Sequence, residues 1–180
     1  MEIPIKIKLG EGAVLPFKKN PTDACDDITA IGLTIKSGEV NPDTGIKSGD
    51  YIQYHTGIYT EIPVGYEVVI RPRSSNRDKD LMMCNAPGTI DANYRGEWLV
   101  CYHINGLPNI KETIDNFGFK YKDDLELLNI IKEKLGIRVY DIKDRIAQCR
   151  LQKLDEYIWQ EVDKLDNSNN RGGGHGSTGR

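Results

Sequence analysis

Short apolar runs, broken by turn signals about every 8 to 12 residues, dominate residues 1–110. Asn41-Pro42-Asp43 and Pro63-Val64-Gly65 are two such turn signals. Apolar and polar residues alternate strictly over residues 3–9, 97–104 and 145–152. Alternation places neighbouring side chains on opposite faces of a strand, so Ala147, Cys149 and Leu151 share one face and Gln148 points to the other. The pattern predicts an all-β sandwich or barrel.

One segment departs from this pattern. Over residues 122–135, Leu125, Leu128, Ile131 and Leu135 recur at helical spacing, acidic residues occupy the first turn, and Gly136 stands at the C-cap position. We therefore predict one β domain over residues 1–165 with a helical insertion at about 109–137. We expect the insertion to pack on its own domain, with docking of a protein partner as the alternative. Residues 166–180 are rich in Gly without an apolar anchor, and are predicted to be flexible.

Composition limits the classes of partner. The 180 residues carry 24 Lys and Arg against 27 Asp and Glu, a net charge of −3, whereas coating of polymeric nucleic acid needs a basic face. No apolar run approaches the roughly 20 residues of a membrane helix, and the start lacks the apolar core of a signal peptide. The four cysteines form no Cys-x-x-Cys pair, so free thiols are expected rather than a zinc site. These features favour a cytoplasmic protein without a membrane partner.

Five places in the sequence hold residues that can carry chemistry. Residues 71–77 gather three arginines and two serines, which suit an anion site or a solvated turn equally well. Residues 86–97 form a predicted hairpin with a glycine near each end and the side chains of Asp91 and Tyr94 between them. Residues 144–148 begin a strand, residues 171–180 could act as a mobile lid or a solvated end, and Asp23, Asp26 and Asp27 form either a metal site or an acidic turn.

In their order, these segments resemble the five motifs of the homotrimeric dUTP diphosphatase (dUTPase) family. Residues 24–28 resemble the first motif, with Asp27 at its acidic position, and residues 72–75 resemble the second. GTIDANYRGE at residues 88–97 is a close match to the third, DRIAQ at 144–148 matches the fourth, and the Arg-Gly-rich tail resembles the fifth. The resemblance covers almost the whole chain outside the insertion.

The resemblance implies a distorted β-barrel or jelly-roll trimer with active sites shared between subunits. It implies hydrolysis of dUTP to dUMP and pyrophosphate, which keeps uracil out of DNA and supplies dUMP for dTMP synthesis. Mg²⁺ would be held mainly by the triphosphate, with Asp27 contacting the metal through water. Asp91 and Gln148 would be the catalytic residues, Asp91 activating the water that attacks the α-phosphorus and Gln148 holding that water. The substrate-binding residues would be Arg73, Ser74, Ser75, Asn85, Gly88, Thr89, Ile90, Tyr94, Arg145, Arg171, His175, Ser177 and Thr178.

Within that set, the segment around Thr89 would recognise the uracil edge and Tyr94 would pack on the deoxyribose, leaving no room for a 2′-hydroxyl. Three departures from the family pattern stand out: a tail one residue shorter between Arg171 and His175, His175 in place of the usual Phe or Tyr, and the insertion. Two alternatives stay open at this point. One is a dCTP deaminase or bifunctional deaminase/diphosphatase of the same superfamily, and the other is a nucleotide-gated regulatory binding protein.

Overall fold

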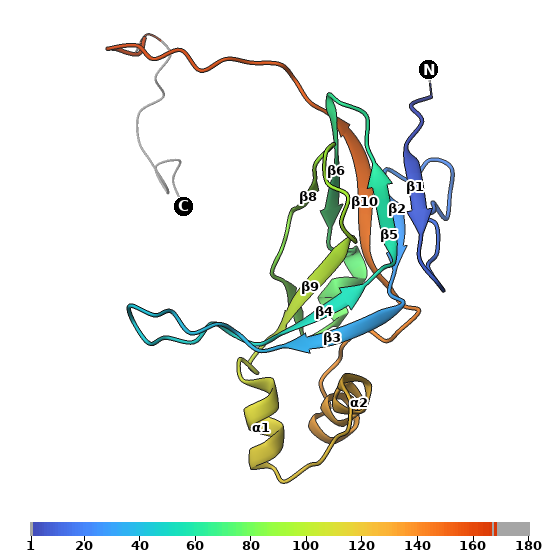
Figure 1. The fold of residues 1–180 in the computed structure, drawn as a ribbon, viewed down its shortest axis with the longest axis vertical. Helices are drawn as coiled ribbons and strands as arrows, with labels where there is room; N and C mark the ends of the chain where they lie inside the picture. Colours follow the sequence, from blue (N-terminus) through green and yellow to red (C-terminus); the bar gives the residue numbers. More distant parts are fainter. Residues whose placement is uncertain (1, 167, 169–180) are drawn as a thin grey trace.

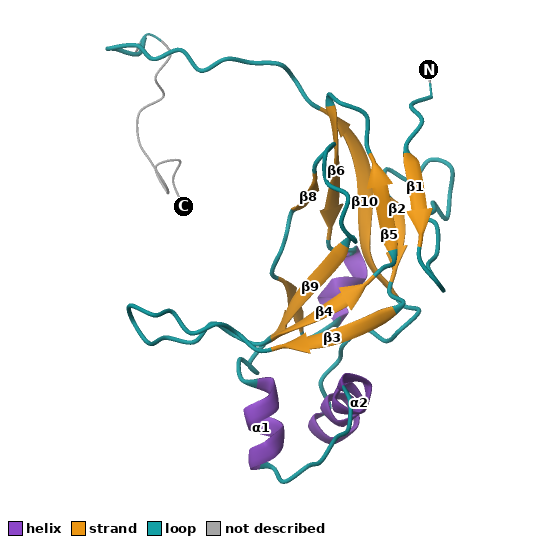
Figure 2. Cartoon of the chain, viewed as in Figure 1, coloured by secondary structure: helices purple, strands orange, loops and turns teal. Residues whose placement is uncertain are grey.

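The computed structural model describes residues 2–166 and 168. This part of the chain contains ten β-strands, two α-helices and one short 3₁₀ helix, η1 (Figures 1 and 2). In chain order, the elements are β1 (Lys6–Leu9), β2 (Asp26–Thr29), β3 (Gly32–Lys36), β4 (Tyr51–His55), β5 (Ile58–Glu61), β6 (Tyr66–Arg71), η1 (Ser74–Asp78), β7 (Leu81–Met83), β8 (Gly88–Ile90), β9 (Leu99–Ile104), α1 (Ile110–Asn116), α2 (Asp124–Leu135) and β10 (Arg145–Lys153).

The strands form two four-stranded sheets and one two-stranded sheet, all antiparallel. Their strand orders are β2-β10-β6-β8, β3-β4-β9-β7 and β1-β5. The inner faces of the two larger sheets contribute to a single core, in which Tyr54 of β4, Ile70 of β6 and Tyr102 of β9 are almost entirely buried. The prediction of an all-β fold is confirmed, with the strands remaining in three sheets rather than closing into one barrel.

Strand β10 follows the predicted alternation, with one local irregularity. Ala147 and Cys149 are buried, whereas Gln148 is half-buried on the opposite face, as expected. Ile146 is also buried, because the register with β2 shifts between Arg145 and Ala147. Such a bulge re-aims the side chain next to it, and here it turns Arg145 at the start of the strand.

The prediction of a hairpin at residues 86–97 is wrong, because the strands at its two ends do not pair with each other. Strand β8 pairs with β6 in one large sheet, and β9 pairs with β4 and β7 in the other. Residues 85–98, here called the crossing segment, therefore lead from one sheet to the other. Gly88 lies close to Ile70, where a Cβ would meet the Ile70 Cβ at 3.3 Å, so the glycine permits the close approach of β8 to β6.

The insertion between β9 and β10 contains α1 and α2, which are drawn below β3 and β4 in Figure 1. Helix α2 ends as predicted, with Gly136 at the C-cap and a φ of 68°. It starts at Asp124, two residues later than predicted, because Asp123 is the N-cap and its carboxylate accepts a hydrogen bond from the Glu126 N–H. The predicted apolar stripe was partly wrong, because Leu125 is 47% exposed. The buried stripe of α2 consists of Leu127, Leu128 and Ile131.

Helix α2 also protects the edge of a sheet. Strand β3 is the outer strand of its sheet, and the Asp124 carboxylate accepts a hydrogen bond from the Ile35 N–H at 3.0 Å. A sheet edge that is left open can pair with another chain, so this contact satisfies a backbone donor and covers the edge. The core-facing residues Ile110 and Ile114 of α1 are fully buried. The insertion thus packs on its own domain.

After β10, the chain runs away from the body of the protein (Figure 1). Residues 155–166 are exposed, and they include Tyr157 (73% exposed), Ile158 (89%) and Trp159 (90%). We call residues 155–166 the C-terminal arm. Large apolar side chains this exposed are typical of a surface that another molecule covers.

Candidate active site

Three segments that are far apart in the sequence meet at one pocket of about 400 Å³. Asp27 comes from β2, Arg73 and Ser74 come from the end of β6 and the start of η1, and Arg145 and Gln148 come from β10. Strand β10 lies between β2 and β6 in the sheet, which explains why these segments converge. The remaining lining residues are Lys19, Asp23, Ala24 and Cys25.

Asp27 organises the positive charge of this pocket. Its Oδ1 accepts a hydrogen bond from Arg73 Nε at 2.6 Å, and its Oδ2 accepts one from Arg145 Nη1 at 2.8 Å. Arg73 also donates through Nη1 to the Ser75 hydroxyl at 3.0 Å. The side chains of Asp27 and Arg73 are only 14% and 20% exposed, so these charge-assisted bonds fix the guanidinium groups before any ligand arrives.

Gln148 stands on the same wall of the pocket. Its Nε2 donates to the Pro72 carbonyl at 2.9 Å, which fixes the amide plane and leaves the amide oxygen as an acceptor. Of the other arginines at residues 71–77, Arg77 is 82% exposed, and its ion pair within the described part of the chain is with Asp78 beside it. Of these two arginines, Arg73 therefore lines the pocket, and Arg77 belongs to a solvated turn.

Asp91 is not brought to this pocket within one chain. Ile90 pairs with Val68 of β6, whereas Gln148 pairs with Arg71 of the same strand. These two positions on β6 are three residues apart, a separation of about 10 Å along the strand. Asp91 is exposed, and its carboxylate has no hydrogen-bond partner among the residues that the structure describes.

The residues predicted to recognise the nucleoside lie along the crossing segment. Asn85 donates through Nδ2 to the Leu99 carbonyl at 3.0 Å and accepts from the Cys101 N–H at 3.0 Å, so its side chain joins the segment to β9. Gly88, Thr89 and Ile90 form β8. Tyr94 is 41% exposed, and its hydroxyl donates to the Glu97 carbonyl at 3.1 Å.

Three residues of the crossing segment have structural roles that the sequence pattern did not indicate. Arg95 donates through Nη1 to the carbonyls of Ala92 at 2.7 Å and Tyr94 at 2.9 Å, which closes the turn after Asp91. Glu97 and Trp98 bind the β4–β5 region. Glu97 ends the motif at residues 88–97, but the sequence pattern does not show these contacts, because the partners of Glu97 and Trp98 lie about 40 residues earlier in the chain.

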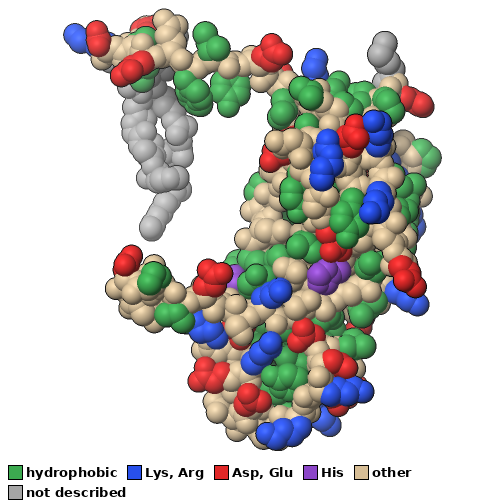
Figure 3. Space-filling model, in the orientation of Figure 1, with side chains coloured by type: hydrophobic (Ala, Val, Ile, Leu, Met, Phe, Trp, Pro, Cys, Tyr) green, Lys and Arg blue, Asp and Glu red, His purple; other side chains and the backbone are tan. Residues whose placement is uncertain are grey.

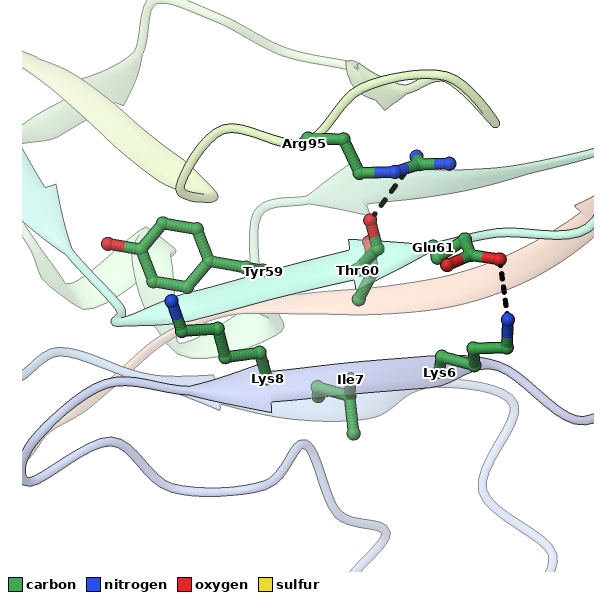
Figure 4. A pocket seen from close by; sticks show the side chains of 7 residues that line it. All are labelled: Lys6, Ile7, Lys8, Tyr59, Thr60, Glu61 and Arg95. Carbon is green, nitrogen blue, oxygen red and sulfur yellow. Dashed lines mark hydrogen bonds and ion pairs between the residues drawn. The ribbon is translucent and has the colours of Figure 1, made fainter.

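Arg95 also borders a second groove, of about 290 Å³, on the outside of β1 and β5 (Figure 4). Lys6 pairs there with Glu61 at 2.7 Å, and Lys8 lies over the Tyr59 ring. The groove contains neither Asp91 nor Gln148, and its acid is neutralised by Lys6. It lacks the acid and amide groups predicted for catalysis.

The acidic run in the first motif does not form a cluster. Asp23 belongs to a turn, in which its carboxylate accepts the Asn20 N–H at 2.9 Å; this backbone hydrogen bond lowers the pKa of Asp23. Asp26 lines a different groove from Asp27. Throughout residues 2–166, the structure brings together no group of three His, Cys, Asp or Glu side chains that could hold a metal ion.

The remaining predictions concern the tail, the surface and the thiols. Arg171, His175, Ser177 and Thr178 lie outside the described residues. On the face drawn in Figure 3, basic and acidic side chains are interspersed rather than gathered into a basic field. The cysteines are free, as predicted. No helix of the described chain has both the length and the apolar character needed to cross a membrane.

Comparisons with known proteins cover nearly the whole chain rather than the pocket alone. No family model matches the chain. The chain is 30% identical to the deoxyuridine 5′-triphosphate nucleotidohydrolase of Maricaulis maris, over 98% of this chain and 97% of that protein. It is 32% identical to the enzyme of the same name from Zymomonas mobilis, over 99% of both chains.

Solved structures share the fold. A Staphylococcus bacteriophage 80alpha dUTPase with dUPNHPP has a TM-score of 0.67 at 24% identity, covering 98% of this chain and 99% of that one. A mutant dUTPase from phage phi11 of S. aureus, described with a structural Mg(II) ion, has a TM-score of 0.59 at 19% identity, covering 91% and 99%. With near-complete coverage of relatives at 30% identity or above, the chain belongs to the deoxyuridine 5′-triphosphate nucleotidohydrolase family.

Proposed function

We propose that this protein hydrolyses dUTP to dUMP and pyrophosphate, by attack of water on the α-phosphorus. One observation carries the proposal: Asp27 of β2, Arg73 after β6, and Arg145 and Gln148 of β10 bring three distant segments together at a single pocket. A pocket with two fixed guanidinium groups suits a polyphosphate, and a neighbouring amide acceptor suits a water molecule. The curated relatives that carry the name of this activity cover nearly the whole chain.

Binding of the triphosphate falls to the arginine side of the pocket. Arg73 and Arg145 are held by Asp27, so they need little reorganisation when negative charge develops on the leaving pyrophosphate. Ser74 adds a hydroxyl donor at the pocket wall. Ser75 supports Arg73, since its hydroxyl accepts from the guanidinium. Phosphoryl transfer depends mainly on this kind of positioning and electrostatic stabilisation.

Activation of water falls to Asp91 and Gln148. The exposed carboxylate of Asp91 would accept the proton of the attacking water. The amide oxygen of Gln148, fixed by the bond to Pro72, would hold the same water in line. Because a base must come within hydrogen-bond reach of the water, Asp91 must approach a pocket that it does not line in its own chain.

The crossing segment would recognise the nucleoside. The amide of Asn85 is engaged with β9, so Asn85 would act by fixing the backbone of the segment, and the peptide groups near Gly88, Thr89 and Ile90 would meet the uracil edge. Tyr94 would pack against the deoxyribose. A hydrogen-bonding surface discriminates between bases more strongly than an apolar pocket does, because a wrong base leaves polar groups unpaired.

Magnesium would arrive with the triphosphate as part of the substrate complex. The donor groups of the pocket fit this arrangement, since both oxygens of Asp27 are engaged by arginines and the described residues form no cluster of three acidic, His or Cys side chains that could hold a metal. The ion supplies charge neutralisation between phosphate oxygens and usually keeps several of its waters. Asp27 would then serve to hold the arginines, with any contact to the ion made through water.

The separation of Asp91 from the pocket supports a shared active site in a homotrimer. In that arrangement, the pocket of one subunit would receive the crossing segment of another. The exposed apolar side chains of the C-terminal arm give further support, because Ile158 and Trp159 need a surface to cover them. Arg171, His175, Ser177 and Thr178 would follow the arm and close over the nucleotide. The cytoplasmic location expected from the sequence remains part of this proposal.

The alternatives are less well supported. A dCTP deaminase needs a glutamate placed to activate water at the base, but Glu97, the acid at the end of the third motif, is engaged with His55 and Gly57. A regulatory binding protein would not require both Asp91 and Gln148. Docking of a protein partner on the insertion is also disfavoured, because the main apolar residues of α1 and α2 are buried in the core.

The test is a pyrophosphate-release assay with dUTP, dTTP, dCTP, dATP, dGTP and UTP, with and without Mg²⁺. We expect release from dUTP in the presence of Mg²⁺ and little from the other nucleotides. A parallel assay for ammonia tests the deaminase alternative. Release of ammonia from dCTP, or equal pyrophosphate release from dTTP and dUTP, would contradict the proposal. Size measurement by light scattering tests the trimer separately.

A further inference from the structure

Glu97 fastens the second end of the crossing segment to the body of the protein. Its Oε1 accepts a hydrogen bond from the Gly57 N–H at 2.8 Å, and its Oε2 lies 3.1 Å from His55 Nδ1. The carboxylate is only 20% exposed, so these bonds form in a partly desolvated place. Gly57 has a φ of 65°, and a Cβ there would lie 2.7 Å from Ile31 and 2.8 Å from Ala13, so the glycine is required by both conformation and space.

The attachment extends through His55 into the sheet. The opposite ring nitrogen of His55, Nε2, lies 3.0 Å from the Thr34 hydroxyl of β3. Thr34 and His55 thus connect Glu97 to two neighbouring strands, β3 and β4. A chain of hydrogen bonds that occupies both ring nitrogens fixes the orientation of the imidazole, and therefore the position of the carboxylate that it meets.

Glu97 in turn determines where the Tyr94 ring lies. The Tyr94 hydroxyl donates to the backbone carbonyl of Glu97 at 3.1 Å. The ring lies across Gly96, where a Cβ would come within 2.3 Å of the Tyr94 hydroxyl oxygen. Tyr94 is 41% exposed, so few neighbours restrain its ring. The hydrogen bond of its hydroxyl and the contact with Gly96 hold the ring in place.

We propose that Glu97 is a positioning residue for sugar discrimination. By binding Gly57 and His55, its carboxylate holds the backbone carbonyl to which the Tyr94 hydroxyl is attached. The inference rests on the proposed function, in which Tyr94 packs on the deoxyribose of dUTP. A ring held in one place makes a 2′-hydroxyl clash, whereas a ring that can move accommodates it. Glu97 therefore contributes to selection of deoxyribonucleotides over ribonucleotides without touching the nucleotide.

Trp98 differs from Glu97 in its role. Its ring is buried in the core, its Nε1 donates to the Thr60 hydroxyl at 3.1 Å, and its backbone carbonyl accepts from the Thr56 hydroxyl at 2.7 Å. Trp98 thus holds the start of β9 in place whether or not the Glu97 side chain is present. Loss of the Glu97 side chain should consequently loosen the crossing segment near Tyr94 and leave the sheet in place.

The experiment compares kcat and KM for dUTP and for UTP in the full-length parent and four variants. Glu97→Ala removes both bonds, Glu97→Gln keeps an oxygen for Gly57 and places an amide group beside His55, and Tyr94→Phe keeps the ring but removes its attachment. Glu61→Ala is the matched control, since Glu61 of β5 makes an exposed ion pair with Lys6 of β1. Thermal unfolding is recorded for each variant.

We expect the ratio of kcat/KM for dUTP to that for UTP to fall by about tenfold in Glu97→Ala and in Tyr94→Phe, the scale of one hydrogen bond in a partly buried place. The kcat of Glu97→Ala for dUTP should change by less than about twofold, because Asp91 and Gln148 are untouched. Glu97→Gln and Glu61→Ala should keep the ratio of the parent. A purely structural role would lower the unfolding temperature without changing the ratio.

Two outcomes would overturn the inference. One is a parental ratio in Glu97→Ala; the other is a Glu97→Gln variant as unselective as Glu97→Ala. If Glu97→Ala does not fold, Tyr94→Phe decides, and a parental ratio in that variant contradicts the inference. A parent that does not hydrolyse dUTP would refute the proposed function instead, so the two failures are distinguishable.

Discussion

The pocket around Asp27 and the crossing segment are held in place by different kinds of contact. In the pocket, charged groups bind one another: Asp27 accepts from Arg73 at 2.6 Å and from Arg145 at 2.8 Å. The crossing segment is held by backbone pairing of β8 with β6 and by side-chain bonds near its ends, from Asn85 to β9 and from Glu97 to Gly57, while Asp91 is exposed. The pocket is therefore organised within one chain, whereas the outward groups of the segment are placed to complete a site elsewhere.

The difference assigns the two regions distinct parts of the reaction. Fixed guanidinium groups stabilise charge that develops on phosphate, and they work best when they do not move. The groups that recognise the nucleoside and activate water must meet the substrate from another side. Substitutions in one region at a time test whether the pocket and the crossing segment have these separate roles.

The largest effect is expected for Asp91→Asn. The amide keeps the size of the side chain but cannot accept the proton of water, so kcat for dUTP should fall by about 10² to 10⁴-fold while dUTP binding is retained. Single-turnover pyrophosphate release and equilibrium binding of a non-hydrolysable dUTP analogue measure the two quantities. Parental turnover in this variant would remove Asp91 from the mechanism.

Mixing two inactive variants tests whether the regions belong to different subunits in one site. Asp91→Asn and Arg145→Ala chains are co-refolded in equal amounts. If each site takes its crossing segment from one subunit and its pocket from another, about a quarter of the sites in random mixtures carry both intact regions. Activity near this level is expected. Activity no higher than that of the separate variants would show that both regions act within one chain.

Asp27→Ala should weaken the pocket and leave the crossing segment intact. Removing the carboxylate leaves Arg73 and Arg145 without their common acceptor in a place where Asp27 is only 14% exposed. We expect a loss of about 2–4 kcal/mol in the free energy of unfolding and a higher KM for dUTP. Urea unfolding and steady-state kinetics measure these effects. Asp26→Ala serves as the control, since Asp26 lines a different groove.

Much of the fold could be predicted from local pattern. Alternation in residues 145–152 placed Ala147 and Cys149 in the core, and Gly136 at the C-cap position predicted the end of α2. Leu125 was misassigned because the helical stripe was inferred without knowing which side of α2 faces β3. The buried Leu127 lies two residues further on, nearly the opposite side of the helix.

The candidate site was predictable in its residues but not in its geometry. The motifs contain Asp27, Arg73 and Gln148, yet nothing local indicates that one carboxylate binds two arginines from different strands. The pairing of β8 with β6 was missed because residues 86–97 read locally as an ordinary hairpin. Glu97 escaped detection for the same reason: its partner Gly57 lies 40 residues away.

The smallest effect concerns Cys84, next to the attached end of the crossing segment. A hydrogen bond from the Cys101 thiol lowers the pKa of Cys84 to about 6, while burial raises the pKa of Cys149 to about 12. Thiolate is the reactive form, so iodoacetamide at pH 7 should modify the exposed Cys84 first and leave Cys149 unmodified, as measured by peptide mass spectrometry.

The same labelling compares the free and occupied crossing segment. The rate at Cys84 should decline as the pH falls through about 6, because the thiolate is then protonated. Saturating dUTP analogue should slow the reaction a few-fold, since Asn85 beside Cys84 would lie under the base, and Cys84→Ser should abolish the early adduct. If the analogue leaves the labelling rate unchanged in a protein that hydrolyses dUTP, the base binds the crossing segment away from Asn85. In that case, the bonds from Asn85 to β9 serve the fold alone.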